Sequence, residues 1–340
     1  MIRYSVGYQL RPLDEEPFSE IVSVYREHIS EVFFSLLDMP SGRGVIDPDD
    51  ASKQRLYDEL KRIQSFGVKL DLLFNANCYG ALSLSKELSN TVCTSIEYLD
   101  KIGCGVEIVT TASPFIAHVI KRNFPNIEVR SSVNMKIGTV KGMEYLADLF
   151  DSFHVQREYN RDLVHLQQLR EWATAHGKRL ILLGNSGCFT HCSGQIFHDN
   201  NVAHQSEICK QANVDDFNPY VCWRQLSNPE HWVKLLQNTW IRPEDIHCYE
   251  GIVDTIKLAT RIHQLPGLVI DAYARRRLIG NTLDLFEPTF SAALAPYVID
   301  NTAFPKNWFD TVTNCDKLCY KCDYCQQVLK KVLINTEMLQ

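Results

Sequence analysis

Short apolar runs rich in β-branched and aromatic residues recur along the chain, and stretches of helical periodicity separate them. These runs predict eight strands, at Arg3–Tyr8, Glu31–Leu37, Lys69–Asn75, Gly105–Thr111, Glu128–Asn134, Ser152–Arg157, Arg179–Gly184 and Thr239–Arg242. Most intervals between strands leave room for one helix and two loops, which is typical of parallel βα units. Eight such units predict an α/β fold, a closed (β/α)8 barrel of TIM type.

Three of the intervening helices are clearly marked. The residues 50–66 place Leu56, Leu60 and Ile63 on one face, and Gly67 follows as a stop signal. The residues 114–123 begin with a proline after Ser113, a favourable capping residue, and the residues 160–176 show the same apolar spacing. These patterns predict helices on the outside of the barrel.

The interval between the last two predicted strands is longer than the others. It contains a cysteine-bearing insertion, residues 185–238, in the region where a barrel carries its chemistry. A second cysteine-rich segment, residues 303–340, follows the last barrel helix. We therefore expect a barrel domain over residues 1–302, including the insertion, and a C-terminal tail over residues 303–340.

Composition limits the class of protein. The chain has 340 residues, 45% of them hydrophobic and 22% charged, as is typical of globular domains. The net charge of −6 argues against a generic electrostatic grip on nucleic acid or an anionic membrane. No long apolar run and no signal peptide are evident, so we expect a cytoplasmic protein without a membrane segment.

Twelve cysteines are unusual for such a chain, and eight of them form two groups. The first group has the spacing C-x3-C-x16-C-x12-C and consists of Cys188, Cys192, Cys209 and Cys222. Four thiolates brought together by loops bind either a tetrahedral zinc ion or a [4Fe–4S] cluster. Zinc ribbons favour paired C-x2-C turns, so the uneven spacing favours a cluster; the alternative is four buried cysteines without a ligand.

The second group has the spacing C-x3-C-x2-C-x2-C and consists of Cys315, Cys319, Cys322 and Cys325. Such a dense run is typical of metal ligation and is similar to the ferredoxin run in reverse order. The outlying cysteine of a ferredoxin run serves another cluster. Cys315 is therefore expected either to bind metal together with its three neighbours or to pair with a cysteine of the barrel instead. Zinc is the alternative metal for this group.

Polar residues lie at the predicted carboxyl ends of the strands, where side chains surround a barrel mouth. These residues are Asp38, Asn75, Thr110, Asn134, Arg157, Glu158, Asn185 and Arg242. Arg157 and Arg242 are candidates to bind an anionic group, with Asn185 beside them. Glu158 and His198 are candidates for proton transfer. For each of them a structural ion pair or hydrogen bond is the alternative.

With these segments in view, the chain resembles peptidase family U32 over roughly residues 4–261. The most specific segment is LLGNSGCFTHCSGQIFH, and IVTTASPFIAHVIKRNFPNIEVRSSVNM, FHVQREYNRDLVHLQQL and WIRPEDIHCYEGIVDTIKLATR agree in pattern. The resemblance implies a (β/α)8 barrel. It also implies a [4Fe–4S] cluster held by four cysteines, as in the oxygen-independent hydroxylases of ubiquinone synthesis and of tRNA uridine. The tail tetrad departs from the simplest members and suggests a second cluster.

The leading hypothesis is therefore an iron–sulfur enzyme of the oxygen-independent hydroxylase type, active under anaerobic conditions. Its substrate would be a small anionic molecule or an RNA-borne group, and a redox partner protein would supply electrons. The first alternative is a peptidase of unassigned catalytic type, as the family name implies. The others are a non-catalytic electron-transfer protein and a zinc-binding scaffold. The sequence contains no Walker A, G-x-S-x-G or H-E-x-x-H motif.

Overall fold

Eight parallel strands close into a barrel in this computed structural model, which describes residues 2–37, 39, 41–42 and 49–339. The strands are β1 (Arg3–Gly7), β2 (Ile29–Phe34), β3 (Lys69–Phe74), β4 (Ile108–Thr111), β5 (Glu128–Ser131), β6 (Ser152–His154), β7 (Arg179–Leu183) and β8 (Thr255–Leu258). They pair in chain order, and β8 closes the ring against β1 with Thr255 opposite Arg3. The predicted (β/α)8 fold, with its cysteine-rich insertion after β7 and its cysteine-rich tail, is confirmed.

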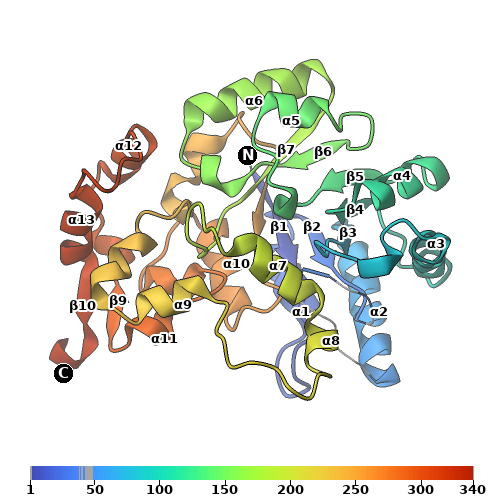
Figure 1. The fold of residues 1–340 in the computed structure, drawn as a ribbon, viewed down its shortest axis with the longest axis horizontal. Coiled ribbons are helices and arrows are strands. Elements are labelled where there is room, and N and C mark those ends of the chain that lie inside the picture. The colour runs from blue at the N-terminus through green and yellow to red at the C-terminus, as the bar shows by residue number, and fades with distance from the viewer. Residues whose placement is uncertain (1, 38, 40, 43–48, 340) are drawn as a thin grey trace.

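Helices cover the outside of the barrel (Figure 1). They are α1 (Phe18–Tyr25), α2 (Asp50–Ser65), α3 (Lys86–Lys101), α4 (Pro114–Asn123), α5 (Val140–Glu144), α6 (Leu163–Ala175) and α10 (Pro266–Ala274). Side chains cap their first turns: Asp49 accepts from Ser52 N in α2, and Ser113 accepts from Ile116 N in α4. Helix α6 begins at 163 and not at the predicted 160, because the Asp162 side chain caps it through His165 N.

The predicted eighth strand at Thr239–Arg242 is wrong. This segment has no strand structure, and the barrel takes its eighth strand from Thr255–Leu258. Trp240 and Ile241 are buried, but they pack outside the sheet, where Ile241 N donates one hydrogen bond of 2.8 Å to Gly184 O. The β-prone residues therefore fill a tertiary contact and do not join the ladder. The connection between β7 and β8 consequently extends over residues 184–254.

That connection contains α7 (Gln195–Ala203), α8 (Gln205–Ile208), α9 (Val221–Leu226) and two 3₁₀-helices, η4 (Pro229–Leu235) and η5 (Pro243–Tyr249). After α10 come η6 (Thr282–Leu285), α11 (Ser291–Leu294), β9 (Tyr297–Ile299), η7 (Asn301–Ala303), α12 (Trp308–Thr313), α13 (Tyr324–Val332), β10 (Leu333–Asn335) and η8 (Thr336–Leu339). Two further 3₁₀-turns, η1 (Gly80–Leu82) and η2 (Val133–Met135), follow β3 and β5, and η3 (Arg157–Tyr159) follows β6.

The tail lies on one side of the barrel, at the left of Figure 1, together with α9 and α11. Strand β10 pairs antiparallel with β9, with Leu333 opposite Ile299, so the tail is joined to the chain that precedes it. The fully buried Trp308 stacks between Trp240 and Tyr324, with ring centroids 6.3 Å and 6.1 Å away. These contacts fix the tail against the β7–β8 connection. None of the helices in the described ranges has the length and apolar character that a membrane crossing requires.

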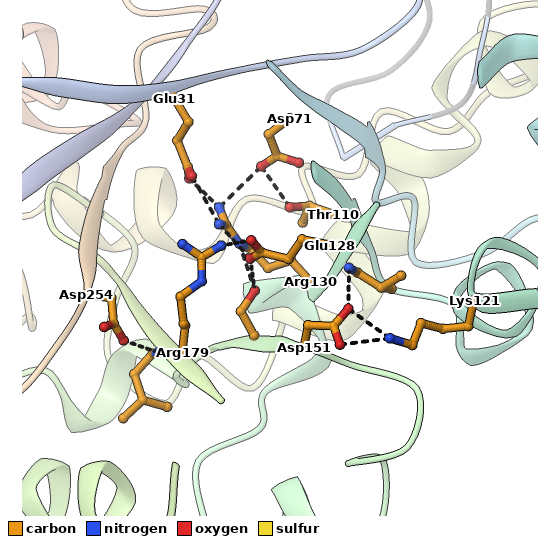
Figure 2. Close-up of polar contacts among 12 residues, drawn as sticks. Glu31, Asp71, Thr110, Lys121, Glu128, Arg130, Asp151, Arg179 and Asp254 are labelled. Carbon is orange, nitrogen blue, oxygen red and sulfur yellow. Dashed lines mark hydrogen bonds and ion pairs between the residues drawn. The ribbon is translucent and has the colours of Figure 1, made fainter. Parts of the chain in front are cut away.

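A layer of charged side chains lies inside the barrel (Figure 2). The fully buried guanidinium of Arg130 donates to both carboxylate oxygens of Glu31, one at 3.1 Å, and to Glu128 Oε1 at 3.0 Å. Asp71 Oδ2 lies 3.6 Å from Arg130 Nη1 and accepts from Thr110 Oγ1 at 2.8 Å. Burial acts to raise the pKa of Glu31, but Arg130 lowers it overall, so this carboxylate is held ionised. One cation thereby joins β2, β3 and β5, and Thr110 adds β4 through Asp71.

Replacing Arg130 by methionine removes that cation and leaves Glu31 and Asp71 buried without it. We expect the free energy of unfolding to fall by about 3–5 kcal/mol, the usual cost of breaking a buried ion pair from one side. Urea denaturation at neutral pH measures it. Arg179 is the matched control, since its half-exposed side chain pairs with Glu128 at the rim of the same layer; Arg179→Met should cost about 1 kcal/mol or less. Equal losses in the two variants would contradict this account.

Candidate active site at the barrel mouth

A cavity of about 350 Å³ opens at the carboxyl ends of the barrel strands. Phe33, Leu73, Leu183 and Lys257 reach it from the strands. The rest of its wall comes from the β7–β8 connection, from the loops after β2, β3, β5, β6 and β8, and from residues 287–288. A larger groove of about 950 Å³ runs between α2 and α3 on the outside of the barrel. Side chains of the helix surfaces line that groove, away from the strand ends, so the mouth cavity is the candidate active site.

Three of the four cysteines of the insertion meet at this cavity. Cys188, Cys192 and Cys222 all line it, although they come from separate parts of the connection. Burial raises the pKa of Cys222 to about 11, and its neighbours Cys188 and Cys192 raise it further. Gly194 permits the close approach, because a Cβ there would lie 2.8 Å from Val221 Cγ2. Three of the four thiols that the spacing grouped therefore line one cavity.

Cys209 does not line the cavity. It is exposed at the end of α8, and the residues that follow it, 211–220, are mostly exposed and without regular structure. In the part of the chain that the structure describes, no three His, Cys, Asp or Glu side chains are already arranged to hold a metal ion. The metal site of the insertion stays a prediction, with three of its four thiols at one place.

Arg157 lies beside Cys188 at the wall of the cavity. Its guanidinium is buried, donates to Ser186 Oγ at 3.3 Å and interacts with the Cys188 side chain. Burial opposes the charge, but Cys188, Glu158 and Asp199 raise the pKa of Arg157 above its usual value. The guanidinium is therefore a buried cation next to the thiols, and its role in binding an anion stays a prediction.

The other predicted residues have different surroundings. Glu158 lies 4.0 Å from Arg157 Nε and does not line the cavity, so it orients the arginine from behind. His198 lines the cavity and packs edge-on against Tyr220, with centroids 4.9 Å apart. Asn75 and Asn134 also line it, Thr110 belongs to the charged layer below, and Asp38 falls outside the described residues.

Asn185 and Arg242 lie away from the cavity. The amide of Asn185 is occupied by backbone: it donates to Ala259 O and Leu285 O and accepts from Ala259 N at 2.7 Å. It thus joins the end of β7 to the segment after β8. The guanidinium of Arg242 lies near Glu244 and over the Phe304 ring on the tail side. Its expected place at a strand end is wrong, because residues 239–242 form no strand.

Two ionisable groups at the cavity were not predicted from the sequence. Burial raises the pKa of Asp199, and the charge of Arg157 partly offsets this shift. Asp199 Oδ2 is buried without a hydrogen-bond partner among the described residues. Lys257, on β8, places its ammonium 3.7 Å from the centre of the Phe33 ring. Burial lowers the pKa of Lys257 to about 8, while Asp71 acts to raise it. Lys257 can therefore exchange protons near neutral pH.

The tail cysteines form a second, separate group. None of them lines the cavity; Cys315, Cys319 and Cys322 are exposed and Cys325 is half-buried. The pKa of Cys325 is raised to about 11, chiefly by burial. The charge of Arg161 acts to lower this pKa, and the three other tail thiols act to raise it, so Cys325 lies near all three. The metal site of the tail tetrad stays a prediction.

Comparison with known proteins relates the chain to one family. It is 25% identical over 84% of its length to the uncharacterized protease MJ1657 of Methanocaldococcus jannaschii, of which the match covers 82%. The fold of the U32 peptidase Mk0906 superposes with a TM-score of 0.53, over 76% of this chain and 92% of that one, at 16% identity. The resemblance to the U32 peptidases is confirmed. No protein-family model matches the chain.

The shifted Lys257 gives a direct test of the cavity's electrostatics. In protein labelled with ¹³C-lysine, we expect the Lys257 Cε resonance to titrate with a midpoint near pH 8, well below the usual lysine range. Asp71→Asn removes a charge that favours the ammonium, so the midpoint should fall further in that variant. A midpoint at the value of the surface lysines would show that Lys257 is not buried at the cavity floor.

The buried thiol of Cys222 offers a second test. In metal-free, reduced protein at pH 8, we expect iodoacetamide to modify Cys222 at least ~100-fold more slowly than a thiol of ordinary pKa, because only the thiolate reacts. Exposed Cys209 is the internal control, and peptide mass spectrometry separates the two sites. Similar rates at Cys209 and Cys222 would contradict the burial of Cys222 at the cavity.

Proposed function

We propose that this U32-type barrel is an iron–sulfur enzyme of the oxygen-independent hydroxylase type, which acts on a small anionic or RNA-borne substrate at the barrel mouth. The observation that carries the proposal is the meeting of Cys188, Cys192 and Cys222 around one cavity. Thiolates are the ligands that iron–sulfur clusters require, and strand ends are where such barrels place their chemistry.

The donor set of the mouth fits a cluster. A [4Fe–4S] centre with four thiolate ligands carries a net negative charge, and Arg157 supplies a buried cation beside Cys188. Cys209 is the fourth ligand of the proposed set, and the irregular segment 211–220 gives the chain around it room to close over the cavity. When bound, the cluster would supply electron transfer.

The other side chains of the cavity would bind the substrate and transfer protons. Arg157 and Lys257 both line the cavity and supply positive charge, which favours an anionic substrate group. Asp199 and His198 lie next to each other on α7, and both line the cavity. We assign proton transfer to these two residues, with Glu158 holding Arg157 in position.

The tail tetrad would bind a second [4Fe–4S] centre, with zinc as the alternative. Arg161 supports this site: it is buried, and among the described residues its guanidinium hydrogen-bonds only to the carbonyl oxygens of Leu236 and Trp240. Lys317 Nζ donates to Arg161 O at 3.3 Å and to Cys315 Sγ at 3.4 Å, which places the tetrad beside this arginine. A buried guanidinium whose hydrogen bonds go to carbonyl oxygens would be stabilised by an anionic metal centre next to it, in addition to the charge of Asp245.

A redox partner protein follows from this proposal, because the electrons for such centres come from outside the chain. The second candidate function is a peptidase, and the names of the two related proteins favour it. Cleavage of gelatin or of a peptide library by metal-free protein would support that alternative. A non-catalytic electron carrier or a zinc scaffold would bind metal at the cysteines but leave the mouth without a substrate.

Metal analysis after anaerobic purification tests the proposal. We expect about four iron and four sulfide per bound cluster. Cys192→Ser should remove the iron of the mouth and leave that of the tail, and Cys319→Ser should do the reverse. Cys93→Ser, in α3 and outside both groups, is the matched control and should change neither.

Two results would contradict the proposal. Zinc in place of iron in wild-type protein would end the iron–sulfur interpretation. Loss of all metal in both single variants would show that the two cysteine groups serve one site and not two.

A further inference from the structure

Cys78 lies on the rim of the barrel mouth, in the loop that follows β3, and faces the end of α7. The N–H of Gly80 donates to Cys78 Sγ at 3.3 Å, and the His204 ring lies against the same glycine, with its Cε1 3.7 Å from the position that a Cβ on Gly80 would take. His204 Nδ1 lies 2.7 Å from Glu207 Oε2, one turn along the chain. Cys78 is half-buried and the His204 side chain is 29% exposed, so a reagent can reach both.

The pKa values of Cys78 and His204 are shifted in opposite directions. The hydrogen bond with His204, followed by that of Gly80 N–H, lowers the pKa of Cys78. The hydrogen bonds with Cys78 and Glu207 raise the pKa of His204. Within the described residues, the charged groups that act on Cys78 are His204 and Glu207. Opposite shifts of this kind are those of a thiolate–imidazolium pair.

This arrangement repeats the logic of a nucleophile, a base and a group that orients the base. The cysteine comes from a βα loop and the histidine from the insertion, so only the folded barrel brings them together. We propose that Cys78 is the nucleophile of an acyl-transfer site at the rim of the mouth, with His204 as its acid–base partner and Glu207 as the positioning residue. The substrate class is a carbonyl compound with a leaving group, a peptide amide or an ester.

The reaction balances without a further co-reactant except water. The Cys78 thiolate attacks the carbonyl carbon, an S–C bond forms, and the bond to the leaving group breaks as His204 gives that group its proton. Water then attacks the thioester, and one of its protons returns to His204. The S–C bond breaks, which releases the carboxylic acid and restores the thiolate.

Alkylation kinetics test the activated thiol in the metal-free, full-length protein. At pH 6.5 we expect iodoacetamide to modify Cys78 at least ~10-fold faster than exposed Cys209, because the lowered pKa of Cys78 increases its thiolate fraction. His204→Asn should abolish the difference, and Glu207→Gln should lower the pH midpoint at which the His204 ring titrates, because the hydrogen bond with Glu207 raises that pKa. Equal rates at Cys78 and Cys209 in wild-type protein would overturn the proposal.

An acyl probe tests the chemistry itself. We expect p-nitrophenyl acetate to give a burst of nitrophenol and one acetyl group on Cys78, found by peptide mass spectrometry, in wild-type protein and in Cys93→Ser. Cys78→Ala and His204→Asn should lose both signals. An undiminished burst in Cys78→Ala would overturn the proposal.

Metal content separates this proposal from the proposed iron–sulfur function. Cys78→Ala should retain the iron of the wild-type protein, whether or not the clusters of the mouth and tail are both present. Loss of iron in Cys78→Ala would overturn the acyl-transfer assignment, because it would make Cys78 a cluster ligand.

Discussion

The pairing of Arg130 with Glu31 inside the barrel is the contact on which the rest of the structure depends. Charged side chains inside a barrel are stable only when each has a partner, and here one guanidinium links carboxylates from β2, β3 and β5. Lys257, on β8, is the next cation above this layer, and its charge balance depends on Asp71 below. The electrostatics of the cavity floor are therefore continuous with the interaction that joins the strands.

The β7–β8 connection supplies what the barrel itself lacks. It brings Cys188, Cys192 and Cys222 to the mouth. Its helix α7 supplies His198 and Asp199 and is followed directly by His204, and its last part packs against the tail. In barrels of this kind, the loops at the carboxyl ends of the strands can acquire different catalytic residues while the buried core of the barrel stays the same. The same segment therefore supplies the thiols of the proposed cluster site and His204 of the proposed acyl-transfer site.

Local pattern was enough to predict most of the fold. Seven strands and the outer helices follow from apolar runs and caps, because those features act over a few residues. The eighth strand was misplaced for a physical reason: Trp240 and Ile241 are apolar and buried without being in the sheet, whereas Lys257 interrupts the true strand with a charge. Burial of that lysine depends on Asp71 and Phe33, which are far away in the chain.

The site was predictable in part. Spacing grouped the cysteines, and the tail tetrad is local enough for spacing to suffice, but it could not show that Cys209 lies apart from Cys188, Cys192 and Cys222. Polar residues at strand ends include Arg157, which lines the cavity, and Asn185, whose amide is occupied by backbone. Asp199, Lys257 and Cys78 carry no sequence signal of their own, because their partners come from other elements.

Anomalous diffraction at the iron absorption edge, from crystals grown without oxygen, tests the central claim most directly. The account predicts an iron peak at the barrel mouth, bounded by Cys188, Cys192 and Cys222, in a closed barrel whose Arg130 contacts Glu31. A mouth without iron in iron-replete crystals, with these three sulfur atoms bonded to nothing in common, would contradict it.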